Sequence, residues 1–89
     1  MNEHRLAAIR KALEATFEPI HLAIDDDSHL HAGHAGAKEG KGHFSVRITA
    51  EAFSGQSLIK RHRAVYAALG ELMETEIHAL AIDARAPEE

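Results

Sequence analysis

The sequence contains no cysteine and no tryptophan, and its aromatic residues are limited to three phenylalanines and one tyrosine. Without cysteine, the chain can form no disulfide, and it has no thiolate of its own to act as a nucleophile or metal ligand. The few aromatic rings offer little surface on which nucleic-acid bases could stack. The core must therefore be built mainly from leucine, isoleucine, valine and alanine.

Charge and hydropathy exclude further classes of protein. The 14 acidic and 10 basic residues give a net charge of −4 with histidine neutral, which disfavours general attraction to nucleic acid. No run of about 18 apolar residues occurs, so neither a membrane-spanning helix nor a membrane partner is expected. The N-terminus enters an amphipathic pattern directly, without the apolar stretch of a secretory signal, which favours a cytoplasmic location.

The N-terminal half of the chain predicts one helix followed by two strands. Residues 3–17 have a helical period, and Glu18-Pro19 ends the helix because proline disfavours helical geometry in the residue before it. Residues 20–25 and 43–50 alternate between apolar and polar side chains, as half-buried strands do. The apolar positions of these three segments are Leu6, Ile9, Leu13 and Phe17; Ile20, Leu22 and Ile24; and Phe44, Val46 and Ile48.

The C-terminal half predicts a second helix and a third strand. Residues 57–74 have a helical period, with Ser57 as N-cap, and residues 77–84 alternate again. The predicted helix stripe consists of Leu58, His62, Val65, Leu69 and Leu72, and the apolar strand face of His78, Leu80, Ile82 and Ala84. A hairpin and a helical crossover then give an α+β fold of αββαβ order, a three-stranded mixed sheet with both helices packed on one face.

Residues 26–42, between the first two strands, contain three closely spaced histidines and four of the six glycines. Neutral imidazole is the commonest protein ligand for metals, and a glycine-rich backbone lets several rings converge on one ion. His29, His31 and His34 are therefore candidate metal ligands, although a solvated polar loop gives the same pattern. Their spacing is not that of a structural zinc site with four ligands.

Other polar side chains near the second helix and the last strand have two interpretations. Lys60, Arg61 and Arg63 begin the helix, where they either contact phosphates or form a solvated face with surface ion pairs. His43 and His62 are interpreted as packed structural residues. His78 opens the last strand, and it is either partly buried or exposed near the mouth of the histidine-rich loop.

Several segments together resemble the BolA family over nearly the whole chain. They are Ser28-His-Leu-His-Ala-Gly-His34, Gly42-His-Phe-Ser-Val-Arg-Ile48, Phe53-Ser-Gly55, Leu58-Ile-Lys-Arg-His-Arg-Ala-Val-Tyr-Ala-Ala-Leu69 and Ile77-His-Ala-Leu-Ala-Ile82. The resemblance implies a single BolA-like domain over residues 1–89. Its fold would be related to class II KH domains, in agreement with the order of elements above.

The resemblance also implies a monothiol glutaredoxin as partner. In that family the partner's cysteine and glutathione hold a bridging 2Fe–2S cluster together with histidines of the BolA-like chain. Carried over to this sequence, the ligands are His78 from the last strand and His31 from the loop, with His29 and His34 as alternatives. The isolated chain is expected to hold no cofactor and to be a monomer or a weak homodimer.

The function expected from this resemblance is not enzymatic. The chain would act in iron–sulfur cluster assembly, trafficking or iron regulation by helping to ligate the shared cluster. The alternative is a KH-like, DNA-binding transcription regulator of stress response and cell morphology, which would use Lys60, Arg61 and Arg63. A small hydrolase or reductase has only the acidic run at residues 25–27 in its favour.

Overall fold

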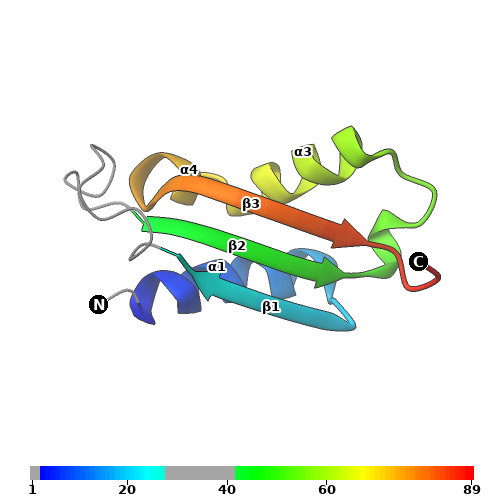
Figure 1. Cartoon of the computed structure of the whole chain (residues 1–89), viewed down its shortest axis with the longest axis horizontal. Helices are drawn as coiled ribbons and strands as arrows, with labels where there is room; N and C mark the ends of the chain where they lie inside the picture. Colours follow the sequence, from blue (N-terminus) through cyan, green and yellow to red (C-terminus); the bar gives the residue numbers. More distant parts are fainter. Residues whose placement is uncertain (1–2, 28–41) are drawn as a thin grey trace.

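The computed structural model describes residues 3–27 and 42–89, which form a three-stranded sheet with helices packed against one face (Figure 1). The predicted α+β class and order of elements are confirmed, with one additional 3₁₀ turn and one additional short helix. In chain order the elements are α1 (Glu3–Phe17), β1 (His21–Asp26), β2 (Gly42–Thr49), η2 (Glu51–Phe53), α3 (Leu58–Leu69), α4 (Leu72–Thr75) and β3 (Ile77–Arg85).

Helix α1 has the predicted bounds and buries the predicted stripe. Ile9 and Leu13 are fully buried, and Leu6 and Phe17 pack against the same core from its edges. The helix ends at Phe17, and the next residue, Glu18, has a positive φ of 45° while its N–H still donates to Glu14 O at 3.0 Å. Pro19 follows directly, so the chain cannot continue the helix.

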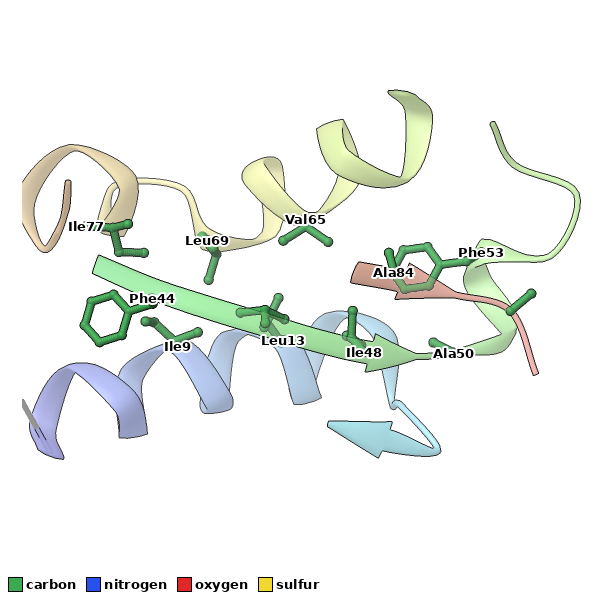
Figure 2. Close-up of a cluster of buried hydrophobic side chains, with 12 residues drawn as sticks. Ile9, Leu13, Phe44, Ile48, Ala50, Phe53, Val65, Leu69, Ile77 and Ala84 are labelled. Carbon is green, nitrogen blue, oxygen red and sulfur yellow. The ribbon is translucent and has the colours of Figure 1, made fainter. Parts of the chain in front are cut away.

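β2 is the central strand of the sheet, in the order β1-β2-β3. It pairs antiparallel with β1 and parallel with β3, as predicted for a hairpin followed by a helical crossover. Phe44, Val46 and Ile48 point from β2 toward the helices and are 1–2% exposed. Figure 2 shows Phe44 and Ile48 meeting side chains from α1, α3 and β3 in one core.

The start of β1 differs from the prediction. Ile20 was expected to share a buried face with Leu22 and Ile24, but it precedes the strand and is 67% exposed. Its backbone N–H still donates to Thr49 O at 2.8 Å, so the hydrogen-bond ladder reaches this position although the packing does not. Leu22 and Ile24 pack against the core as predicted.

The predicted helix over 57–74 is wrong in one respect, because it is interrupted at Gly70. Gly70 has a φ of 54°, and its N–H donates to Tyr66 O at 3.0 Å, which closes the last turn of α3. This left-handed geometry is readily adopted by glycine and ends the helix. Ser57 is the N-cap as predicted, since its hydroxyl accepts from the Lys60 N–H at 3.2 Å.

The buried face of α3 agrees with the prediction at Val65 and Leu69 but differs in the first turn. Leu58 and Ile59 are 68% and 64% exposed, whereas Val65 and Leu69 are almost fully buried together with Arg61. The first turn of α3 therefore projects beyond the core. Within residues 3–27 and 42–89, no helix is long and apolar enough to cross a membrane.

Candidate functional site

His78 lies on β3 at a β-bulge. Gly42 of β2 pairs with Ile77, and the next residue, His43, pairs with Ala79, so His78 is an extra residue without a partner on β2. The extra residue changes the alternation of side chains. Ile77 is 2% exposed and points into the core, while His78 is exposed and leaves the face on which Leu80 and Ile82 pack.

The predicted register of His78 with Leu80 and Ile82 is therefore wrong. A regular strand would have turned the imidazole toward the helices, and the bulge turns it to solvent instead. Bulges re-aim single side chains and are frequent beside functional sites. Of the two interpretations of His78, the structure supports the exposed one.

His43 lies directly beside His78. The two ring centroids are 4.9 Å apart with an angle of 53° between the planes, and His43 is only 5% exposed. Its burial agrees with the expectation of a packed residue. Its contact with His78 was not foreseen, because the two histidines are on different strands and only the shifted register brings them together.

The described residues that flank segment 28–41 are Asp27 and Gly42, and both are hydrogen-bonded at or beside the strands that carry these histidines. The Asp27 N–H donates to His43 O at 2.8 Å, and Ser45 Oγ donates to the Asp27 carboxylate. At the other end, the Gly42 N–H donates to Glu76 O at 3.0 Å, two residues before His78. His29, His31 and His34 lie outside the described residues, but the chain leaves the sheet and returns to it at the end where His78 lies (Figure 1).

An ion pair anchors the start of α1 to the segment that leads into β3. Arg5 Nε donates to Glu76 Oε1 at 2.8 Å, and His4 Nε2 lies 3.8 Å from the same oxygen. The hydrogen bond from Arg5 lowers the pKa of the Glu76 carboxyl from its usual value. The Glu76 carboxylate is thus held in its ionised form by Arg5, and the pair fixes the start of α1 beside the chain that enters β3.

An exposed imidazole is a suitable ligand for iron or another soft-to-borderline metal, because its ring nitrogen is accessible. Within residues 3–27 and 42–89, however, no group of three or more His, Cys, Asp or Glu side chains is arranged to hold a metal ion. His78 fits the role of one donor to a group whose other ligands come from elsewhere. The described part of the chain does not provide a closed tetrahedral site.

Arg61, one of the three candidate phosphate-binding residues, is occupied inside the protein. It is 5% exposed and donates from Nε to Gln56 O at 2.9 Å and from Nη1 to Ala84 O at 3.0 Å. Its two terminal nitrogens also bind the Glu89 carboxylate, each at 2.5 Å. This hydrogen bonding raises the pKa of Arg61 and lowers that of Glu89 to about 2.

Lys60 and Arg63 remain exposed on α3, while the neighbouring His62 is partly buried. The helix contains no acidic residue, and its exposed surface also includes Leu58, Ile59 and Tyr66. The first turns of α3 lie toward the end of the molecule opposite the bulge (Figure 1). The structure thus separates the candidate metal ligand from the candidate phosphate-binding residues, and it leaves Arg61 out of the exposed set.

Comparison with known proteins gives the class of this fold. Residues 13–89 match the family model described as BolA-like protein, so the chain belongs to the BolA-like family. The solved structure of BolA1 from Arabidopsis thaliana superposes with a TM-score of 0.83, at 39% identity over 98% of this chain and 96% of that one. The BolA domain of SufE1 from the same plant gives a TM-score of 0.82 at 40% identity, over 94% and 93% of the two chains. The predicted relation to class II KH-like folds is thereby confirmed.

Sequence comparison gives the same family. The chain is 43% identical over 90 residues to chloroplastic protein BOLA1 of Arabidopsis thaliana, which covers 98% of this chain and 56% of that protein. It is 36% identical over 74 residues to the DNA-binding transcriptional regulator BolA of Escherichia coli strain K12, covering 83% and 68%. The chain spans little more than half of the BOLA1 protein, and it covers 23% of the plant SufE-like protein 1.

Proposed function

We propose that this chain is a non-enzymatic partner of a monothiol glutaredoxin, with which it holds a bridging 2Fe–2S cluster. The supporting observation is the bulge at His78, which exposes a single imidazole at the end of the sheet where residues 28–41 begin and end. His78 would be one ligand, and His31 the second, with His29 and His34 as alternatives. Glutaredoxin cysteine and glutathione would complete the set.

The chemistry of the donor set agrees with this role. A chain without cysteine offers no thiolate to iron, and replacement of thiolates by neutral histidines raises a cluster's reduction potential. His43 packs against His78 and limits the orientations open to that ring. Bound to both proteins, the cluster would be either cargo for transfer or a signal of iron status, and the cytoplasm remains the predicted location.

Anaerobic reconstitution tests the proposal. The chain is mixed with a monothiol glutaredoxin, glutathione, iron and sulfide, and visible absorption and circular dichroism are compared with those of the glutaredoxin alone. We expect a mixed complex with its own spectrum, which is lost in His78→Ala and altered in His31→Ala. His29→Ala and His34→Ala identify the loop ligand if His31→Ala behaves as wild type.

His21→Ala is the matched control, because His21 is also an exposed strand histidine but lies at the opposite end of the sheet. It should form the mixed complex normally. The proposal fails if no mixed complex forms at any ratio, or if His78→Ala and His21→Ala behave alike.

A second candidate is DNA binding through α3, for which the exposed cations Lys60 and Arg63 and the absence of acidic residues in this helix are the supporting observations. The name of the relative from Escherichia coli describes that protein as a DNA-binding transcriptional regulator. DNA binding by the isolated chain should weaken steeply with salt and weaken further in the double variant Lys60→Gln/Arg63→Gln. Salt-independent binding, or binding unaffected by both changes, would exclude this mode.

A further inference from the structure

The face of the sheet away from the helices has a row of three polar side chains where β1 begins and where β2 and β3 end. His21 of β1 pairs with Thr49 of β2, and Thr49 pairs in turn with Arg85 of β3. The neighbours Ile48 and Ala84 are buried in the core. Because side chains alternate along a strand, Thr49 and Arg85 project from the open face.

Arg47 lies next to this row. It pairs across the sheet with Ala23 on one side and with Asp83 on the other. Arg85 Nε donates to Asp83 Oδ1 at 3.0 Å, and this hydrogen bond raises the pKa of Arg85. The negative charge of Asp83 is thereby balanced by Arg85. Among the residues that the structure describes, no ion pair of Arg47 is found, and its guanidinium is exposed.

These side chains surround a hollow of about 240 Å³. Its lining consists of His21, Arg47, Ile48, Thr49, Asp83 and Arg85. The volume is below the roughly 300–1,000 Å³ of sites that enclose a drug-sized ligand. A small anionic group fits this space, with any larger remainder of the molecule lying outside it.

We propose that this hollow binds the phosphate group of a small phosphorylated molecule. The Arg47 guanidinium has a free planar fork that matches two oxygens of a tetrahedral oxyanion. Thr49 adds a hydroxyl, and His21 and the terminal nitrogens of Arg85 can donate from either side of it. A phosphate group has enough peripheral oxygens to accept from all of these groups at once, whereas a carboxylate has two.

The rest of the open face confines the anion to this end. Toward the bulge, Asp25 pairs with Ser45 on this same face, and Asp27 lines a separate hollow beside His43. The whole chain has a net charge of −4, so binding here would require the local arrangement and would not follow from general attraction. This hollow and His78 lie at opposite ends of one sheet.

Titration of the full chain with inorganic phosphate, followed by two-dimensional ¹H–¹⁵N NMR, tests the proposal. Chloride is adjusted to keep the ionic strength constant. We expect saturable shifts centred on the backbone amides of Arg47, Thr49 and Arg85. Arg47→Gln should weaken binding by about tenfold or more, because a charge-assisted bidentate contact is lost. Arg47→Lys, which keeps the charge without the fork, should bind with intermediate affinity.

Arg10→Gln is the matched control, since it removes an exposed arginine from α1, away from this face of the sheet, and should leave phosphate binding unchanged. A parallel titration with adenosine monophosphate distinguishes the two sources of a phosphate group. Equal or tighter binding than inorganic phosphate indicates a phosphorylated metabolite, and weaker binding indicates free phosphate. Shifts that do not saturate, an equal loss in Arg10→Gln, or equal competition by acetate would each overturn the proposal.

Discussion

The two ends of β3 place their polar groups in opposite environments. Near its first residues, His78 is exposed on a bulge and contacts the buried His43. Near its last residues, the backbone oxygen of Ala84 accepts a hydrogen bond from Arg61, whose guanidinium is 5% exposed and bound to Glu89. At the first end an imidazole is open to other molecules, whereas beside the last residues the Arg61 guanidinium has its donors satisfied inside the protein.

The difference shows that residue type alone does not identify a binding site, because an arginine or histidine can already have its hydrogen-bond partners inside the protein. Arg61 offers more hydrogen-bond donors than His78, but its nitrogens bind Gln56, Ala84 and Glu89. If Arg61 left these partners to bind a phosphate, the Glu89 carboxylate and the Ala84 carbonyl would lose the hydrogen bonds that they accept from it. Metal binding at His78 would carry no comparable cost, because the bulge already turns the imidazole away from the core.

The largest effect on stability should come from Arg61→Met, which keeps an unbranched apolar stem but removes every donor. The Ala84 carbonyl and the Glu89 carboxylate then lose a buried partner, and such losses are among the costliest single changes. We expect the largest fall in Tm of the variants considered, measured by thermal unfolding. Arg63→Met, at an exposed position of the same helix, should leave Tm nearly unchanged. Equal shifts in the two variants would contradict the structural role of Arg61.

His43→Ala should have the next largest effect. The ring is 5% exposed, so its removal leaves a cavity at the start of β2 and should lower the free energy of unfolding by about 2 kcal/mol. Chemical denaturation measures this loss. His43→Ala should also weaken the mixed complex with glutaredoxin, because His78 loses its packing partner. A variant as stable as wild type would indicate that the burial of His43 contributes little.

Acid should gradually remove the contribution of the Glu89 carboxylate to the free energy of unfolding. Its pKa is about 2 in the folded chain against an ordinary 4.5, mainly because Arg61 donates to the carboxylate. A lowered folded pKa stabilises the fold fully above the unfolded value, and the contribution is lost as the pH falls from about 4.5 toward 2. The stability difference between wild type and Glu89→Gln should therefore be constant near neutral pH and shrink over this interval. A difference that persists unchanged at low pH would rule out the titration of Glu89 as its origin.

The smallest effect on stability is expected for His78→Ala. An exposed residue at a bulge has few contacts to lose, and the free energy of unfolding should change by no more than about 0.5 kcal/mol. The same variant should lose the mixed cluster spectrum completely. If His78→Ala loses the cluster spectrum but keeps its stability, and Arg61→Met loses stability, the contrast between the two ends of β3 is established.

Local patterns were sufficient to predict most of the fold. The helical period of residues 3–17 predicted α1, and the apolar–polar alternation predicted β2, because the pattern of each buried face lies within one continuous segment. The break in the second helix was missed, although a glycine inside a helical pattern, here Gly70, can signal the end of a helix. Ile20 could not be placed, because alternation does not show where the covering helices end.

The geometry of the candidate site was harder to predict, because it depends on contacts between residues that are distant in the sequence. The bulge at His78 arises from pairing with β2, and the partner of Arg61 lies 28 positions further along the chain. No pattern within a single segment contains this information. The resemblance to the BolA family identified His78 as a candidate, but its orientation and its contact with His43 required the pairing of the strands.

The parallel pairing of β2 with β3 has a consequence for folding kinetics. Gly42 meets Ile77 and Thr49 meets Arg85, so every contact of this pair closes a long loop that contains the crossover helix. Contacts between distant residues slow folding, because the chain loses loop entropy before the contacts form. We therefore expect α1 and α3 to gain helical structure early and the docking of β3 to limit the rate, with the bulge at His78 formed only in that last step.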